Sequence, residues 1–488
     1  MNKRLSVLVL ATGLSACTVG PNYAGPPTVA TETAFHRAGD LPAGPPLARW
    51  WLTLNDAELN RLEDAALSGS PTVAAAEARL RQSRAGLNAA RANLWPTTGT
   101  SAAYVHADGL GSALGALSGG QSSGSQTSSG AGSSASASGS GSKDLELYSA
   151  NFDAIWEVDL FGGTRRAIEG ARDESEAAQA QLDDARVTLT AEVAQAYVQL
   201  RDLQQRLALA KENTDLESHT LDLTRVRRNG GTASDLDVER LTTLLETTRA
   251  TIVPLQAQLA EQFDRLAVLT GQVPGALDKE LGTQQPVPLP PATVQVGDPT
   301  SLLQRRPDIR AAERKLAQQT AAIGQQKANL FPKLTLIGTL GYGSTKLSTL
   351  FDNDNRSSIQ APLLQWTPFD FGRTHAAITR AEAARDEAEA NYRQTVLAAL
   401  QDAETSLSRY GRQRDAVADQ ARVEASASRA AQLTDIKVRG GTATTIDQLD
   451  AERSRIEAQS SASEAAAQLT QDYIALQKSL GLGWQPQS

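Results

Sequence analysis

The chain has 488 residues, of which 40% are hydrophobic and 21% charged, a composition typical of folded proteins rather than disordered ones. Its formal net charge of −8 argues against a nucleic-acid partner, which requires a basic face. The single cysteine excludes an internal disulfide framework and a four-cysteine zinc site. The four histidines lie far apart and in no metal-binding spacing, so we expect no metal site.

The N-terminus has the features of a secretory signal peptide. Lys3 and Arg4 precede a short apolar run over residues 5–14, which is too short to span a bilayer. Cys17 follows two small residues directly after this run, in the pattern of a bacterial lipobox. We therefore expect residues 1–16 to be removed and Cys17 to carry a covalent lipid such as palmitate. A chance cysteine behind an ordinary signal peptide is the alternative.

An internal repeat organises the rest of the chain. Residues 71–96 match residues 307–332 at an offset of 236, with eleven identities in 26 positions. Farther along the chain the offset becomes 210, so that Trp156 corresponds to Trp366. The sequence therefore predicts two copies of one structural unit.

The change of offset places 26 extra residues in the first copy, where a low-complexity tract over residues 107–142 has 23 Gly or Ser in 36 positions. Such a tract buries too little apolar surface to order itself, so we expect a flexible loop that faces outside. It contains a Gly-x-Ser-x-Gly match at 120–124. That hydrolase motif needs a strand before it and a helix after it. Neither is expected here, and we predict no catalytic residue.

Each copy predicts a helix, two strands and a pair of long helices. Pro71 and Pro307 suit the first turn of a helix. Residues 164–229 contain no proline and repeat apolar residues at heptad spacing, which indicates a long coiled-coil helix. Paired glycines then permit a tight reversal into a returning helix. Pro254 is expected to kink or loosen the first returning helix.

The strand segments carry most of the aromatic residues, and residues 147–158 alternate between apolar and polar side chains. This alternation is typical of a membrane β-barrel, although a half-buried soluble sheet alternates equally well. Four strands cannot close a barrel, because the smallest membrane barrels have eight. An open edge in lipid leaves unpaired backbone groups. We therefore expect several copies to share one barrel, with three copies giving twelve strands and an open lumen.

Several motifs together resemble the outer membrane factor family, the TolC-like channels, in its NodT-type lipoprotein branch that serves resistance-nodulation-division (RND) efflux pumps. The motifs are Cys17 to Tyr23, Trp50-Trp51, the Asn-Leu-aromatic-Pro sequences that end at Pro96 and Pro332, Asp159 to Gly162, Arg305 to Ile309, and two Gly-Gly-Thr-Ala turns. The residue after Cys17 is Thr18 rather than an aspartate. In this respect the chain resembles lipoproteins of the outer membrane, which lack an aspartate at that position.

The resemblance implies a mostly α fold with a small β part. Three chains would form an α-helical barrel of long coiled-coil hairpins, joined to a shared twelve-stranded transmembrane β-barrel with four strands per chain. It also implies a lipid-anchored outer-membrane location with a long periplasmic extension, and the role of passive exit duct for drugs or other small toxic solutes. The implied partners are a periplasmic adaptor and an inner-membrane RND transporter, with no enzyme activity and no cofactor besides the lipid.

The resemblance further implies residue roles at the periplasmic end. Asp447 and Asp450 match an acidic pair that would form carboxylate rings at the entrance and favour cations. A solvated acidic helix start is the alternative, because acids stabilise helix N-termini in any case. Asp235 and Asp237 are the weaker equivalents in the first copy.

The tyrosine and arginine that hold some family members shut align with Val438 and Ala443, so closure would need other contacts, such as apolar packing or ion pairs of Arg439. The residues expected at the hairpin tips, where the adaptor would dock, are Gly230, Gly231, Thr232, Gly440, Gly441 and Thr442.

Two other functions remain open at this stage. The same fold would serve type I protein secretion, and a periplasmic adaptor lipoprotein also has a lipobox and a coiled-coil hairpin, although only one hairpin. The expected organisation is a signal peptide at 1–16, a lipidated extended segment and belt at 17–70, a first repeat at 71–271, a linker and equatorial belt at 272–306, a second repeat at 307–480 and a tail at 481–488.

Overall fold

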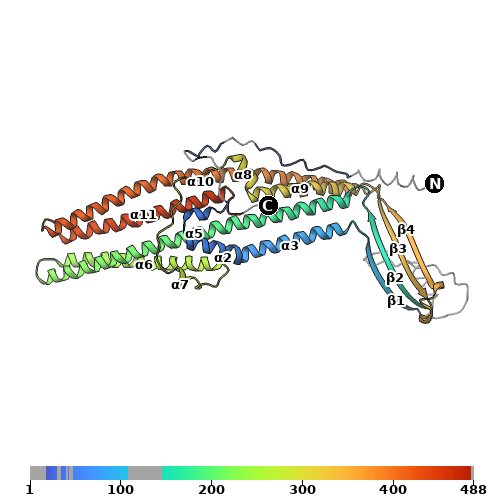
Figure 1. Cartoon of the computed structure of the whole chain (residues 1–488), viewed down its shortest axis with the longest axis horizontal. Coiled ribbons are helices and arrows are strands. Elements are labelled where there is room, and N and C mark those ends of the chain that lie inside the picture. Colours follow the sequence, from blue (N-terminus) through green and yellow to red (C-terminus); the bar gives the residue numbers. More distant parts are fainter. Residues whose placement is uncertain (1–17, 30–33, 40–41, 43–47, 108–144, 485–488) are drawn as a thin grey trace. The chain divides into compact units, whose positions relative to one another are not determined.

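The computed structural model describes residues 18–29, 34–39, 42, 48–107 and 145–484 (Figure 1). Helices dominate this part of the chain and strands are few, which confirms the expected mostly α class with a small β part. The elements, in chain order, are η1 (Trp50–Leu54), α2 (Ala57–Gly69), α3 (Pro71–Ala92), β1 (Thr97–Ala107), β2 (Leu145–Val158), α5 (Gly163–Asn229), α6 (Asp235–Leu269), α7 (Asp278–Leu281), α8 (Pro299–Arg305), α9 (Pro307–Ala328), β3 (Lys333–Ser344), η2 (Leu347–Thr349), η3 (Asn353–Asn355), β4 (Arg356–Gln365), α10 (Arg373–Arg439) and α11 (Thr445–Ser479).

The chain divides into two compact units, each built from separate stretches of sequence. One, called the sheet unit below, holds the strands and the adjoining helix ends; the other, called the helical unit, holds most of the helices. The sheet unit comprises Met1–Tyr23, Gly86–Ala171 and Thr320–Ala383, and the helical unit comprises Ala24–Ala85, Arg172–Gln319 and Ala384–Ser488.

The helices begin and end where the sequence predicts. Pro71 and Pro307 are the first residues of α3 and α9, a position at which the missing amide N–H of proline costs no helical hydrogen bond. α5 and α10 are equivalent in the repeat and have 67 residues each. α6 continues through Pro254, so the proline does not break it; the residue is exposed, which lets water reach the carbonyl that it leaves unbonded.

The strands form one antiparallel sheet in the order β1-β2-β3-β4 (Figure 1). Its two faces differ, as the alternation in β2 predicts. On one face the Asp153 carboxylate accepts hydrogen bonds from Ser101 Oγ at 3.3 Å and from Thr339 Oγ1 at 2.9 Å. β1 and β4 are the outer strands of the sheet in one chain, and β4 contains Pro362, whose nitrogen cannot donate a hydrogen bond.

The core of the helical unit gathers around two tryptophans. Trp50 and Trp51 are buried in η1, and their rings meet edge to face with centroids 5.8 Å apart. The Trp50 ring also meets Tyr473 of α11 at 6.0 Å. Thr53 and Tyr473 share a hydrogen bond of 2.8 Å between their hydroxyl groups. The Trp50-Trp51 motif is therefore a packing element that ties the N-terminal part of this unit to its last helix.

Candidate functional site

Two turns join the long helices in pairs at one end of the helical unit (Figure 1). Between α5 and α6, the Gly231 amide donates to the Arg228 carbonyl and the Thr232 amide donates to the Arg227 carbonyl, both at 2.9 Å. The φ of Gly231 is 75°, in the left-handed region that favours glycine. These bonds satisfy the last helical carbonyls and reverse the chain.

The turn between α10 and α11 repeats this geometry. The Gly441 amide donates to the Val438 carbonyl at 3.0 Å, and the Thr442 amide donates to the Lys437 carbonyl at 2.9 Å. The φ of Gly441 is 74°. The six residues predicted as adaptor-docking tips therefore occupy two equivalent turns, and docking itself stays a prediction.

The acidic residues that follow these turns form capping boxes. The Asp447 carboxylate accepts hydrogen bonds from the backbone and the hydroxyl of Thr444, both at 2.7 Å, and the Asp447 amide donates back to that hydroxyl at 3.1 Å. Asp237 does the same with Ser234 at the start of α6. The backbone hydrogen bond and then the hydroxyl lower the pKa of each carboxyl. Both acids thus start helices, the alternative that the sequence left open beside a gating role.

The cap makes the second hairpin tip sensitive to acid. Because the pKa of Asp447 is lower in the folded protein than its ordinary 3.8, its contribution is complete above pH 3.8 and is lost as the pH falls through the folded value. We expect the amide hydrogens at the start of α11 to exchange faster at low pH, after correction for intrinsic rates. Asp447→Asn should remove this pH dependence, whereas Asp450→Asn, outside the cap, should keep it.

The other two predicted gate residues lie in exposed ion pairs. Asp235 pairs with Arg228 across the first turn at 2.7 Å, and Asp450 pairs with Arg453 one turn along α11 at 3.8 Å. Exposed ion pairs contribute little to stability. Both carboxylates are therefore exposed within a single chain, and their gating role stays a prediction.

The two positions that are predicted to align with the gate contacts of some family members carry no charge. Val438 is half-buried near the end of α10 and Ala443 is half-buried in the turn. Arg439, the cation proposed for a substitute contact, pairs instead with Asp435 of its own helix at 2.7 Å. A contact of Arg439 with a second chain would therefore compete with this pair.

The two hairpins contact each other near their tips. Leu449 of α11 is buried in a small apolar cluster with Leu221 of α5 and with Leu241 and Leu245 of α6. Farther along, Arg455 of α11 pairs with Glu212 of α5 at 2.7 Å. Apolar packing and an ion pair therefore join the two hairpins within one chain near their tips.

Arg306 and Arg201 are two arginines with interactions that the sequence did not predict. The Arg306 guanidinium pairs with Asp308 at 2.7 Å and with Asp402 at 3.2 Å. Arg201, buried in α5, donates to the Thr283 carbonyl at 2.8 Å and lies over the Tyr197 ring at 4.7 Å. In the sequence, it was one charged residue on a long amphipathic helix.

A second buried arginine, Arg166, holds the start of the described chain within the sheet unit. Its guanidinium donates to the carbonyls of Val19 and Gly20 at 3.2 and 3.3 Å and to Asn22 Oδ1 at 2.6 Å. Gly20 packs on Gly324, where a Cβ on Gly20 would lie 2.3 Å from the Gly324 Cα. The glycines were the available sequence signal, because only residues without side chains allow this approach.

Loss of the Arg166 hydrogen bonds should release the segment at Val19 to Asn22. Arg166→Ala removes three part-buried hydrogen bonds from a charged donor, at a cost of about 2 kcal/mol, so local opening should increase roughly tenfold or more. The readout is hydrogen exchange at the Val19 amide, which donates to the Phe161 carbonyl at 3.1 Å. Arg172→Ala, which removes an exposed arginine from α5, should leave this exchange unchanged. Equal exchange in both variants would show that Arg166 does not hold the segment.

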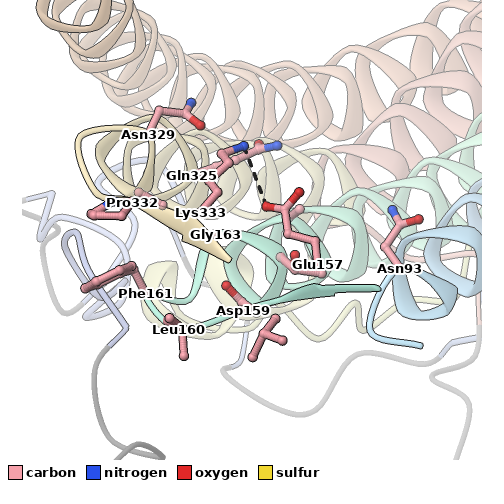
Figure 2. A pocket seen from close by; sticks show the side chains of 14 residues that line it. Asn93, Glu157, Asp159, Leu160, Phe161, Gly163, Gln325, Asn329, Pro332 and Lys333 are labelled. Atoms are coloured by element: carbon pink, nitrogen blue, oxygen red, sulfur yellow. Dashed lines mark ion pairs between the residues drawn. The ribbon is translucent and has the colours of Figure 1, made fainter. Parts of the chain in front are cut away.

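Three of the motifs that carry the family resemblance, the two Asn-Leu-aromatic-Pro sequences and Asp159 to Gly162, border a cavity of about 200 Å³ in the sheet unit (Figure 2). It is lined by the ends of β2 and α9, the starts of β3 and α5, and the segments that follow α3 and α9. Glu157 and Lys333 pair across it at 3.6 Å. Asp159 caps α5 by accepting from the Arg165 amide at 2.9 Å. The charged groups that line the cavity therefore form an ion pair between β2 and β3 and a helix cap, rather than a catalytic pair.

Three sequence-based predictions lie outside the described residues: the signal peptide at 1–16, the lipidated Cys17 and the Gly/Ser-rich loop from residue 108 onward. Across the residues that are described, no helix combines the length and the apolar character needed to cross a membrane.

Comparison with known proteins agrees with this fold along nearly the whole chain. Pyoverdine export outer membrane protein OpmQ of Pseudomonas aeruginosa is 30% identical over 491 residues, which cover 99% of this chain and 97% of that protein. The solved outer-membrane channel OprN is 34% identical, with a TM-score of 0.82 over 96% of this chain and all of that one. The open state of the Neisseria gonorrhoeae MtrE outer membrane channel is 25% identical, with a TM-score of 0.77 over 96% of this chain and 98% of that one.

The model of one protein family, described as outer membrane efflux protein, matches residues 62–272 and 299–482. The two matched ranges fall on the two copies of the internal repeat, so both copies carry the family pattern. Together with the shared fold, this establishes that the chain belongs to the outer membrane efflux protein family, a family of channels rather than enzymes.

Proposed function

We propose that three copies of this outer-membrane efflux protein form one passive exit duct for drugs or other small toxic solutes. The sheet carries this proposal: within the described residues, its outer strands β1 and β4 each have one paired neighbour. An unpaired backbone group in lipid costs several kcal/mol. The edges therefore need other copies, and three copies supply twelve strands, enough to surround an open lumen.

The helical hairpins support the same assembly. A single chain leaves many large apolar side chains exposed along its long helices, more than a solvated helix surface requires. Packing of the hairpins of neighbouring copies around a common axis would cover them and enclose a tunnel. These exposed residues include Leu223, Val226, Leu236, Val253, Leu397, Val423, Leu433, Ile436 and Ile446.

The partners follow from the position of the hairpin tips and from the class of relatives. We propose that a periplasmic adaptor docks at the two Gly-Gly-Thr turns and that an inner-membrane RND transporter supplies the solute. Cys17, acylated after removal of residues 1–16, would add a lipid anchor in the outer membrane. OpmQ is named for pyoverdine export, which supports a small solute rather than a protein as cargo.

Deletion of the gene tests this role in cells. We expect the deletion strain to accumulate ethidium and to become several-fold more sensitive to pump substrates, and the wild-type gene to restore both. A matched variant that replaces Gly231 and Gly441 with valine should be exported but fail to restore efflux, because valine disfavours the left-handed backbone of the turns. Unchanged accumulation together with loss of a secreted protein would favour protein secretion instead.

A further inference from the structure

The internal repeat extends from the sequence into the register of the sheet. The offset of 236 carries β1 onto β3, and the offset of 210 carries β2 onto β4. In the β1–β2 pair, Gly99 faces Asp153. Their equivalents, Thr335 and Leu363, face each other in the β3–β4 pair. The two outer strand pairs therefore have the same register, and the repeat predicts one from the other.

The repeat also relates the central strand pair, β2 with β3, to a pairing of β4 with β1, which one chain cannot form. β2 pairs with β3, and Asp153 faces Thr339 there. The same offsets carry these two residues onto Leu363 of β4 and Ala103 of β1. β4 and β1 are opposite edges of the sheet, so this equivalent pair can form only between two copies of the chain.

An aromatic stack beside the β2–β3 pair also has an equivalent in the repeat that one chain does not form. Phe161, after β2, stacks on Phe331, before β3, with ring centroids 4.6 Å apart and planes 17° from parallel. The offsets carry this pair onto Phe371 and Trp95. In a single chain these two rings are 96% and 74% exposed. Phe371 also has a φ of 54°, a conformation that a phenylalanine adopts only when its surroundings hold it.

We propose that β4 of one copy pairs antiparallel with β1 of the next in the register that the repeat specifies. Leu363 then lies opposite Ala103 of the partner subunit, and Phe371 stacks on Trp95 of the partner subunit. The inference rests on the proposed assembly of several copies and adds to it the register of the joined edges and the aromatic contact beside them.

This register also keeps the faces of the sheet consistent. Asp153, Ser101 and Thr339 mark the polar face, and Ala103 and Leu363 stand on that face because side chains alternate along a strand. A slip of one residue would bring opposite faces together across the junction. In this register, the described residues that pair across the junction run from Ile359 to Gln365 in β4 and from Ser101 to Ala107 in β1 of the next copy.

Engineered cysteines test the register in the full-length lipidated protein. Leu363→Cys with Ala103→Cys should form a disulfide under mild oxidation, because paired residues bring their Cα atoms within about 4.5–5.5 Å. Denaturing electrophoresis should then show covalent dimers and trimers. The control, Leu363→Cys with Ala102→Cys, places the thiols on opposite faces and should stay monomeric. Asp153→Cys with Thr339→Cys, the equivalent pair within one chain, reports the yield that this geometry gives.

The outcomes separate the junction from the proposed function. A native mass of three chains with cross-linking only in the Ala102 control, or in neither pair, overturns this register and leaves the duct standing. A native mass of one chain with no intermolecular cross-link in any variant overturns the duct and the junction together. Intermolecular cross-linking confined to the Ala103 pair supports both.

The aromatic contact has its own test. Trp95→Ala and Phe371→Ala should each lower the temperature at which the trimer separates into monomers, and the double variant should lower it no further than the larger single effect. Phe369→Ala removes a neighbouring exposed ring that has no stacked equivalent, and should leave this temperature unchanged. Additive losses from Trp95→Ala and Phe371→Ala would show that the two rings do not meet.

Discussion

Replacement of Trp50 by alanine is expected to lower the free energy of unfolding of the helical unit by about 3–5 kcal/mol. The indole is 1% exposed and contacts the rings of both Trp51 and Tyr473. Its removal leaves a cavity at the point where η1, the N-terminal part of this unit, meets α11. Circular dichroism, which does not depend on the deleted fluorophore, can follow the thermal or denaturant transition.

Leu52→Ala is the matched control for Trp50→Ala. Leu52 lies in the same short helix, but 44% of it is exposed, so its loss should cost much less than 1.5 kcal/mol. If both variants unfold at the same point as the wild type, the tryptophan pair is not a central packing element.

Glu63→Gln is expected to stabilise the protein, increasingly so as the pH rises. Glu63 lies on the buried face of α2 beside Leu59, Leu62 and Ala66, and neither carboxylate oxygen has a hydrogen-bond partner within the described chain. Burial, and secondarily the charge of Asp64, raises the pKa of Glu63 well above its ordinary 4.5. Because the side chain is 0% exposed in one chain, no neighbouring copy can reach it to supply a partner.

The sign of this pH dependence follows from proton binding. Between the unfolded pKa and the raised folded pKa, the folded state holds the proton that the unfolded state has released, so stability falls as the pH rises. Each pH unit in that window lowers the free energy of unfolding by about 1.4 kcal/mol. Glu63→Gln removes this loss, and the difference from wild type should grow from pH 4.5 upward.

Unfolding midpoints measured from pH 4.5 to pH 9 test this prediction. Glu58→Gln serves as the control, since Glu58 lies on the same helix in an ion pair with Arg61 near the surface. Parallel pH profiles for wild type and Glu63→Gln would show that the carboxyl finds a partner or water when it ionises.

The repeat let the sequence predict most of the fold. Proline at the first helical position, paired glycines at the turns and heptad spacing in α5 are local signals, because each acts within a few residues. The two capping boxes are local as well. The alternation in residues 147–158 indicated the two faces of β2, whereas residues 357–366 were ambiguous because β4 carries apolar side chains on both faces.

The contacts that the sequence did not predict join residues far apart in the chain. Arg166 looked like any charged residue at a helix start, and its role depends on the approach of Gly20 to Gly324. Glu63 sits one position from Leu62 in an amphipathic helix, and nothing local separates a buried glutamate from a solvated one. The predicted gating role of Asp450 and Asp447 stays a prediction, because it depends on neighbouring copies, which a single chain does not contain.

Conductance across a planar lipid bilayer tests the exit duct most directly. Purified, lipidated protein with a native mass of three chains should produce discrete, long-lived current steps, and the charge-neutral variants Asp447→Asn and Asp450→Asn should reduce the preference for cations. The same trimers, inserted into the bilayer and yet silent in both wild type and variants, would contradict a continuous pore.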